Sequence, residues 1–152
     1  REKGLPTVVV RLLNTGGPRQ TGRYGMVIPT FVAQAKSGKP ITVYGTGTQI
    51  RCFGHVHDIA NAIIKLMDTK KAFGEIVNLG STEAITMNRL AEKIKKMTRS
   101  KSKIVHIPYK KAYSPTFDDM QKRVPDLSKA KKIIGYRPTY TLEEILRSMI
   151  NQ

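Results

Sequence analysis

The spacing of apolar residues along this chain alternates between two periods, and this alternation predicts an α/β fold. Residues 7–13, T-V-V-V-R-L-L, are β-branched and apolar almost throughout, which predicts a strand buried on both faces in a parallel sheet. Residues 58–67 carry apolar side chains at helical spacing, which predicts a helix packed through one broad face. Similar patterns predict strands at 41–44, 75–79 and 103–107, and helices at 27–37, 86–98, 127–134 and 141–150.

Several of these helices have suitable residues at their ends. Thr86 is expected to cap the helix that follows it, and Thr141 forms a complete capping box with Glu144. Asp126 is expected to cap the helix at 127–134, and Asp58 to help begin the helix at 58–67.

The composition predicts one folded unit. The chain has 152 residues, of which 39% are hydrophobic and 25% charged, so a single unit over 1–152 with a core of its own is expected. Apolar runs stay well short of the roughly 18–20 residues that a membrane span needs, and the charged N-terminus lacks the apolar core of a signal peptide. Cys52 is the single cysteine, and the pattern of residues suggests no metal site. We therefore expect a cytoplasmic protein without membrane contact.

The formal net charge of +16 would suit a nucleic-acid or anionic-membrane partner. However, the lysines cluster on predicted solvent faces, as at Lys93, Lys95 and Lys96, and aromatic residues make up only 7% of the chain. A solvated basic surface is therefore the favoured interpretation, and nucleic-acid binding is a less favoured alternative.

The segment 44–58, Y-G-T-G-T-Q-I-R-C-F-G-H-V-H-D, is the leading candidate for ligand binding. It follows a predicted strand, turns on Gly45 and Gly47, and presents Arg51 among apolar and aromatic neighbours. A glycine-rich turn with an arginine just beyond it can hold a phosphate. The alternative is a hairpin turn followed by an exposed arginine.

Further candidates stand at the ends of predicted elements. Asn14 follows the first strand, where ligands bind in open α/β sheets, although it could simply satisfy a turn. Met26 and Val27 stand at a helix entry, where backbone N–H groups can meet an anion. Asn78 is near another strand end, and Arg123 lies in a segment that the following Val-Pro pair keeps extended.

Catalytic groups with supporting partners are missing from the sequence. It contains no paired-carboxylate cluster, no G-x-S-x-G, no G-x-G-x-x-G fingerprint and no Tyr-x-x-x-Lys pair. Asp118 and Asp119 are adjacent and expected to be solvated, and His106 is expected to be structural, without an evident partner. The residues alone predict an α/β domain that holds an anionic ligand.

Five stretches, in this order, resemble the carboxyl-terminal half of the extended short-chain dehydrogenase/reductases that act on nucleotide sugars. They are R-L-L-N-T-G-G-P-R-Q-T-G-R-Y-G-M-V-I-P, V-Y-G-T-G-T-Q-I-R-C-F, H-V-H-D-I-A-N-A-I, N-L-G and Q-K-R-V-P-D-L-S-K-A. The family includes UDP-sugar 4-epimerases, nucleotide-sugar 4,6-dehydratases and UDP-glucuronate decarboxylases. The resemblance implies the substrate-binding part of such an enzyme together with the last strands of its Rossmann sheet.

The resemblance also implies a nucleoside-diphosphate sugar as the ligand. Arg51 matches the diphosphate-binding arginine of the family, and Arg123 a second basic clamp. Asn14 matches an asparagine near the phosphates, and Asn78 one near the nucleoside diphosphate. The other matches are Met26 and Val27, at a helix start that meets the diphosphate and nucleoside, and Thr42 and Tyr44, on a strand lining the base pocket.

The chain departs from the family pattern at two positions and in length. His57 stands where the family usually has an acidic residue, and Cys52 where it often has serine. Family members carry an amino-terminal Rossmann half with the NAD site and the Tyr-x-x-x-Lys acid/base pair, and these 152 residues contain neither. NAD is therefore expected to bind mainly to that other half, and no cofactor and no catalytic residue are expected on this chain alone.

The leading hypothesis is the substrate-binding half of an NAD-dependent nucleotide-sugar epimerase, 4,6-dehydratase or decarboxylase, present as a fragment or as one piece of a split enzyme. The alternatives are a non-catalytic nucleotide-sugar binding module and a basic nucleic-acid-binding domain. Without the other half, the strands at 7–13 and 75–79 would leave apolar faces and edges uncovered. We therefore expect the chain to pair with an amino-terminal half or to form a homodimer.

Overall fold

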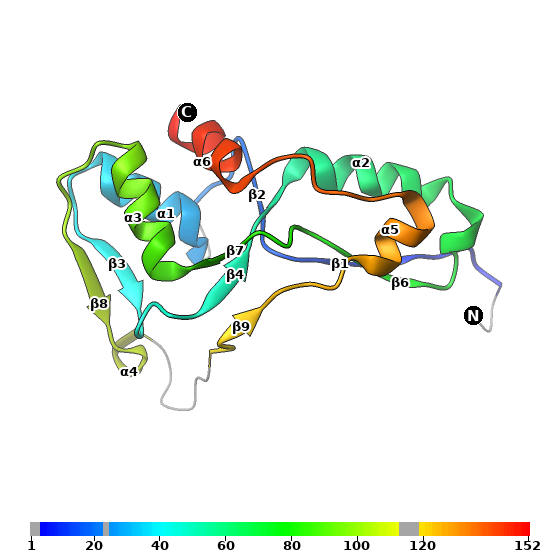
Figure 1. Ribbon diagram of the computed structural model, residues 1–152, viewed down its shortest axis with the longest axis horizontal. Helices are drawn as coiled ribbons and strands as arrows, with labels where there is room; N and C mark the ends of the chain where they lie inside the picture. Colours follow the sequence, from blue (N-terminus) through cyan, green and yellow to red (C-terminus); the bar gives the residue numbers. More distant parts are fainter. Residues whose placement is uncertain (1–3, 23–24, 113–118) are drawn as a thin grey trace.

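The structure is a computed structural model that describes residues 4–22, 25–112 and 119–152, and they form an elongated α/β molecule (Figure 1). The helices are α1 (Val27–Lys36), α2 (Val56–Met67), α3 (Met87–Met97), α4 (Tyr109–Ala112), α5 (Ser128–Ile134) and α6 (Leu142–Ile150), with a 3-10 helix at Lys70–Ala72. The strands are β1 (Val9–Leu12), β2 (Thr15–Gly16), β3 (Ile41–Tyr44), β4 (Ile50–Cys52), β5 (Gly54–His55), β6 (Ile76–Leu79), β7 (Ala84–Thr86), β8 (Ile104–Ile107) and β9 (Lys122–Arg123). The predicted fold class is confirmed.

The strands of the described chain pair in small sheets. Three of these sheets are parallel pairs, namely β1–β6, β2–β5 and β3–β8. The other has the order β7-β4-β9, with β4 antiparallel to β7 and parallel to β9. Hydrophobic patterning predicted β1, β3, β6 and β8, whereas the two- and three-residue strands are too short to show a period.

Side chains at the helix ends largely act as predicted. Thr86 Oγ1 accepts a hydrogen bond from the backbone N–H of Arg89 at the start of α3, and the capping box of Thr141 and Glu144 is present at α6. Asp126 lies one residue outside the predicted position, because Leu127 stands at the N-cap of α5. The Asp126 carboxylate still accepts a hydrogen bond from the first N–H of α5, at 2.8 Å.

Asp58 does not begin α2, which corrects the sequence-based expectation. The N-cap residue is His55, whose Nδ1 accepts a hydrogen bond from the His57 N–H at 3.1 Å. The Asp58 carboxylate accepts hydrogen bonds from Thr139 N (2.9 Å), Thr139 Oγ1 (2.5 Å) and Tyr140 N (3.2 Å). Asp58 therefore fixes the connection between α5 and α6 onto α2, because its carboxylate meets backbone donors of that connection.

Apolar side chains collect in two clusters. The larger cluster lies among α1, β3, α3 and α6, and its fully buried members include Ile41, Leu90 and Ile145. The smaller cluster lies among α2, β6 and α5, and includes Leu66 and Val77. In Figure 1 the elements of the two clusters occupy opposite ends of the long axis.

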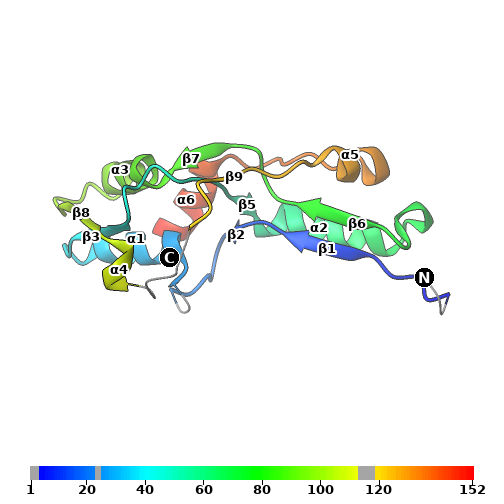
Figure 2. The ribbon, with the colours of Figure 1, turned by 90° about the horizontal axis from the view of Figure 1, so that it is seen from below.

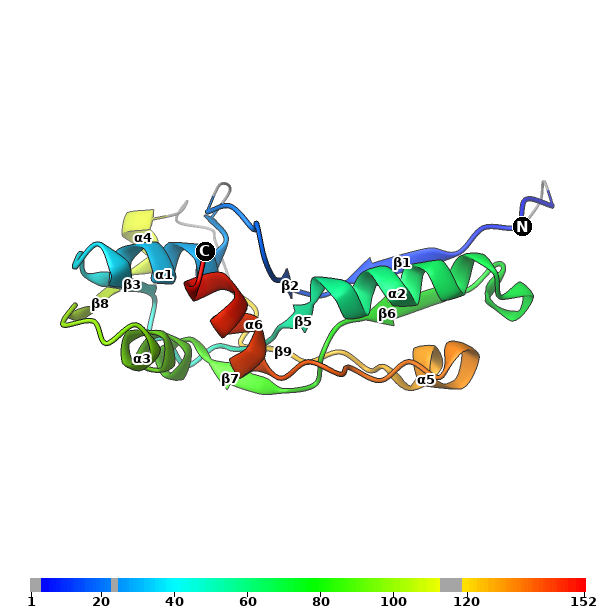
Figure 3. The ribbon, with the colours of Figure 1, turned by 90° about the horizontal axis from the view of Figure 1, so that it is seen from above.

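The β1–β6 pair is covered on one face only. Helix α2 lies over that face, as Figure 3 shows, whereas in Figure 2 no element of the described chain lies over the opposite face. Val9 and Ile76 are paired across the two strands and are 54% and 45% exposed. The prediction that the first strand is buried on both faces is therefore wrong, because only one side has a covering layer. The prediction of uncovered apolar faces is confirmed by the same observation.

Candidate functional site

A cavity of about 400 Å³ lies beside α1, β3 and β4. Much of its wall is apolar and aromatic, with Phe31 and Phe53 among the lining residues. Its lining includes five of the eight predicted binding residues: Asn14, Val27, Thr42, Tyr44 and Arg51. The fold thus brings together residues from four separate elements or connections, which is the arrangement expected of a ligand site.

The glycine turn between β3 and β4 connects the cavity residues Tyr44 and Gln49. Gly45 and Gly47 both have left-handed backbone conformations, with φ of +66° and +73°. Neither position has space for a side chain, because a Cβ at Gly45 would overlap the Tyr109 ring and one at Gly47 would overlap the Asn88 side chain. Asn88 also donates a hydrogen bond to the carbonyl oxygen of Thr46 at 3.0 Å. The turn is therefore held in one shape by its neighbours.

Arg51 lies on β4, the central strand of the three-stranded sheet, and its side chain is 14% exposed. The alternative of an exposed arginine after a hairpin is therefore wrong. The Nη1 atom donates hydrogen bonds to the carbonyl oxygens of Ile50 (2.8 Å) and Met120 (2.7 Å). The Nη2 atom donates to Asp119 Oδ1 at 2.5 Å, in an ion pair. These contacts fix the guanidinium at the cavity wall.

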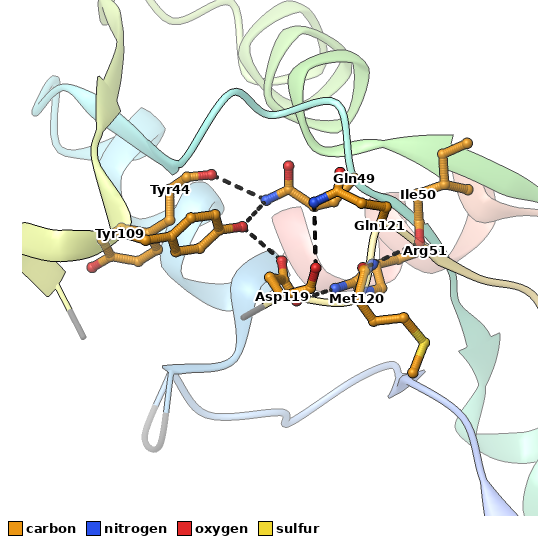
Figure 4. A network of polar contacts seen from close by, with 8 residues as sticks. All are labelled: Tyr44, Gln49, Ile50, Arg51, Tyr109, Asp119, Met120 and Gln121. Atoms are coloured by element: carbon orange, nitrogen blue, oxygen red, sulfur yellow. Dashed lines mark hydrogen bonds and ion pairs between the residues drawn. The ribbon is translucent and has the colours of Figure 1, made fainter. Parts of the chain in front are cut away.

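Asp119 connects Arg51 to a polar network of other residues that line the cavity (Figure 4). Its Oδ2 atom accepts a hydrogen bond from the Tyr109 hydroxyl at 2.6 Å. The same hydroxyl accepts one from Gln49 Nε2 at 2.8 Å, and Gln49 Nε2 also donates to the carbonyl oxygen of Tyr44 at 3.0 Å. The expectation of a solvated carboxylate is wrong for Asp119, whose side chain is 19% exposed, and Asp118 lies outside the described residues.

Asn14 serves a turn and also lines the cavity. Its φ of +34° lies in the left-handed region, which asparagine tolerates. Its Nδ2 donates to the Cys52 carbonyl oxygen at 3.0 Å, and its own carbonyl oxygen accepts from the Gly54 N–H at 3.1 Å. Asn14 thus joins the end of β1 to the end of β4 and the start of β5.

The helix start and the strand predicted for the nucleoside also meet at the cavity. Val27 is the first residue of α1, and Met26 holds the N-cap position without a side-chain hydrogen bond to the helix. Val27 lines the cavity, whereas Met26 is 44% exposed and does not. On β3, the Thr42 hydroxyl accepts a hydrogen bond from Gln34 Nε2 at 2.8 Å, and Tyr44 lines the cavity at the strand end.

Two predicted residues, Asn78 and Arg123, lie outside the cavity lining. Arg123 is exposed on β9, directly beside Arg51 in the parallel register of β4 and β9. Asn78 is on β6, and its Nδ2 donates to the Asp126 carbonyl oxygen at 3.1 Å. Asn78 therefore holds the segment that follows Arg123.

Gln49, Tyr109 and Asp119 are cavity residues that the sequence analysis did not select. Gln49 falls inside the candidate segment 44–58, but nothing in its spacing marks it as buried. Asp119 is 68 residues from Arg51 in the chain, so no local pattern pairs them.

Other titratable groups have structural surroundings. Burial raises the pKa of the Cys52 thiol, and the nearby Glu83 carboxylate adds to this shift. Burial lowers the pKa of His55, with a further contribution from His57. His106 does have a partner, contrary to expectation, because its Nε2 lies 2.9 Å from Asn88 Oδ1.

The part of the chain that the structure describes offers neither a helix that could span a membrane nor a cluster of metal ligands. None of its helices is long and apolar enough to cross a membrane. Within the same residues, no group of three or more His, Cys, Asp or Glu side chains is placed to hold a metal ion.

Residues 1–149 match the family model of GDP-mannose 4,6 dehydratase. The chain belongs to this family. A curated relative, the UDP-N-acetyl-alpha-D-glucosaminuronate decarboxylase of Bacillus cytotoxicus, is 40% identical over 149 residues, which are 97% of this chain and 46% of the relative. UDP-glucuronic acid decarboxylase 1 of Danio rerio is 37% identical over 150 residues, which are 99% of this chain and 34% of the relative.

Solved structures of the family share the fold. The UDP-glucose 4-epimerase of Thermotoga maritima, determined with UDP-glucose, matches with a TM-score of 0.87 and 30% identity over 99% of this chain and 46% of that one. The UDP-glucuronic acid 4-epimerase of Bacillus cereus, determined with UDP-glucuronic acid and NAD, gives a TM-score of 0.85 and 26% identity over 97% and 45%. The chain spans less than half the length of these relatives.

These comparisons confirm the resemblance drawn from the five sequence stretches. The family members found are nucleotide-sugar decarboxylases, epimerases and dehydratases of the extended short-chain dehydrogenase/reductase type. The arrangement of parallel strands and helices in this chain is the one that its structural relatives have.

Proposed function

We propose that this chain binds a nucleoside-diphosphate sugar in the cavity beside α1, β3 and β4. In this role it is the substrate-binding half of an NAD-dependent nucleotide-sugar decarboxylase, epimerase or 4,6-dehydratase. The observation that carries the proposal is the meeting of Asn14, Val27, Thr42, Tyr44 and Arg51 in one cavity. These residues come from four separate elements or connections, and all were selected from the sequence as ligand contacts.

The cavity has separate surfaces for the charged and uncharged parts of such a ligand. Arg51 supplies the positive charge for the diphosphate, because a guanidinium forms strong charge-assisted hydrogen bonds with phosphate oxygens. Thr42 and Tyr44 line the side proposed for the base, and Val27 begins α1, whose first N–H groups favour an anion. Met26 stands at the same helix start and is proposed to contribute through its backbone.

Arg123 and Asn78 have supporting roles in this proposal. Arg123 stands beside Arg51 on the neighbouring strand and offers a second positive charge next to the cavity. Asn78 positions the segment after Arg123 through the Asp126 carbonyl oxygen. A diphosphate carries two charges, so two adjacent arginines match it better than one.

Among nucleotide sugars, a UDP-linked sugar acid is the first ligand to test. Two curated relatives with 40% and 37% identity are decarboxylases of UDP-linked sugar acids. One structural relative was determined with UDP-glucuronic acid. The aligned region covers nearly all of this chain.

Catalysis is proposed to need a complementary half. The residues of this chain do not fit NAD, because they include neither a glycine-rich dinucleotide fingerprint nor a Tyr-x-x-x-Lys pair. The uncovered face of the β1–β6 pair supports the same proposal, since Val9 and Ile76 would be buried by an added layer. We propose that the complementary half continues this sheet and supplies NAD.

Isothermal titration calorimetry of the chain with UDP-glucuronic acid, UDP-glucose and dTDP-glucose tests the proposal. We expect saturable binding of at least one ligand, with UDP-glucuronic acid the tightest. Arg51→Gln should weaken binding by roughly tenfold to a hundredfold, because it removes a charged hydrogen-bond donor. A thermal melt of the variant establishes that it is folded.

Arg147→Gln is the matched control. It removes the same charge from α6, where the Arg147 side chain is 68% exposed and pairs with Glu143. Its affinity should stay within about twofold of the original, because exposed charges contribute little. Absence of binding to all three ligands, or an equal loss in both variants, would contradict the proposal.

A further inference from the structure

The cavity proposed for an anionic ligand already contains an anion of its own. Asp119 lines the cavity and lies 2.5 Å from Arg51 Nη2, the side chain proposed to meet the diphosphate. Both side chains are shielded from water, at 14% exposed for Arg51 and 19% for Asp119. A cation with this little solvent requires a counter-anion, and Asp119 is that counter-anion when no ligand is bound.

Asp119 is also held from its other side. Its Oδ2 atom accepts a hydrogen bond from the Tyr109 hydroxyl at 2.6 Å. Its backbone carbonyl oxygen accepts a hydrogen bond from Gln121 Nε2 at 3.3 Å. The Tyr109 hydroxyl is fixed in turn by Gln49 Nε2 at 2.8 Å. The Tyr109 hydroxyl therefore positions the carboxylate independently of Arg51. This hydrogen bond remains when Arg51 binds another anion.

We propose that Asp119 competes with the phosphate groups of the ligand for Arg51. This inference rests on the proposed function of the cavity and assigns a regulating residue to it. When a ligand phosphate binds Arg51, Asp119 gives up the guanidinium and remains hydrogen bonded to Tyr109. Asp119 thus keeps Arg51 oriented in the empty cavity and lowers the affinity for the ligand.

Competition has a defined energetic basis. Asp119 is tethered beside Arg51, so it acts at a high effective concentration against any ligand in solution. The competition is screened only weakly by solvent, because both side chains are largely shielded from water. It vanishes when the carboxylate becomes an amide, whereas the shape of the side chain is retained.

Three variants measured with UDP by titration calorimetry test the inference. Asp119→Asn should tighten UDP binding by roughly tenfold, the order of coupling between partly buried charges. Asp119→Glu keeps the negative charge and should stay within about threefold of the original affinity. Glu143→Gln makes the same change of net charge at a distant ion pair on α6 and should stay within about twofold.

The decisive measurement repeats Asp119→Asn in an Arg51→Gln background. If Asp119 acts through Arg51, the tenfold gain should be lost there, because no guanidinium remains to be released. A gain that persists would overturn the inference in favour of a general charge effect. Weaker or unchanged UDP binding by Asp119→Asn, with a normal thermal melt, would also overturn it, since Asp119 would then only hold Arg51 in place.

Failure of the underlying proposal gives a different result. If neither the original chain nor Asp119→Asn binds UDP, the proposed function fails and this inference with it. If the original chain binds UDP and Arg51→Gln weakens it, but Asp119→Asn brings no gain, only the inference about Asp119 fails.

Discussion

Replacing Asp58 with alanine should destabilise the protein more than any change at its surface. The Asp58 carboxylate is 7% exposed and accepts three hydrogen bonds from the connection between α5 and α6. Two of the donors are the backbone N–H groups of Thr139 and Tyr140. Alanine offers no acceptor, so the variant leaves these donors without the partner that they have now.

The expected loss follows from the number and type of these bonds. A hydrogen bond to a charged group contributes about 1.5–3 kcal/mol, and contributions within one network do not add fully. We therefore expect Asp58→Ala to lower the free energy of unfolding by about 3–5 kcal/mol. For a chain of this length, that corresponds to a fall in melting temperature of roughly 10 °C.

Urea unfolding followed by circular dichroism measures this difference. Asp68→Ala is the matched control, because Asp68 is an exposed carboxylate at the other end of the same helix. It should change the free energy of unfolding by less than about 0.5 kcal/mol. A loss below about 1 kcal/mol for Asp58→Ala would refute the reasoning, because it would mean that the connection is held by its apolar contacts alone.

Three further predictions concern the turn, the alkaline pH range and the uncovered strand pair. Gly47→Ala should cost about 1–2 kcal/mol from its left-handed φ alone, with more from overlap with Asn88, and unchanged urea unfolding would contradict the turn geometry. Burial, and secondarily the Asp58 carboxylate, raise the pKa of Tyr136 from 10.0 to about 12, so the neutral form is favoured in the folded state. The stability that the Tyr136 hydroxyl contributes is complete below pH 10 and is lost as the pH rises towards 12. Tyr136→Phe should therefore lose less stability than the original chain between these pH values. Equal losses of stability in the two proteins would count against this. The chain should self-associate at high concentration in light scattering, and Val9→Lys should reduce this by placing a charge on the uncovered face, whereas a monomeric original chain would disprove it.

Local sequence rules were sufficient for the longer elements. The strand at Ile41–Tyr44 was predicted with its observed bounds, and the ends of α1, α3 and α6 differ by at most one residue from the prediction. Helical spacing and capping residues act within a few positions, so the sequence shows them directly. The sheet of β7, β4 and β9 was not predicted, because it joins two- and three-residue segments from distant parts of the chain.

Single residues of the candidate site were predictable from local sequence patterns and from the family resemblance. Arg51 was selected from its position after a glycine turn, and the structure places it at the cavity. Its ion pair with Asp119 was not predictable, because the two residues are 68 positions apart and no periodic pattern relates them. The burial of β1 was overestimated for a related reason, since an apolar pattern indicates that a surface favours burial but not what covers it.

The division of the core into two clusters has a consequence for how sequences of this type can diverge. The residues that line the cavity belong to the end of the molecule with the larger cluster, whereas the uncovered strand pair belongs to the end with the smaller one. Substitutions that repack one cluster leave the other largely untouched, because distant sites act nearly additively. The cavity and the uncovered strand pair can therefore change separately during evolution, so that substitutions which reshape the cavity leave the exposed face of β1 and β6 as it is.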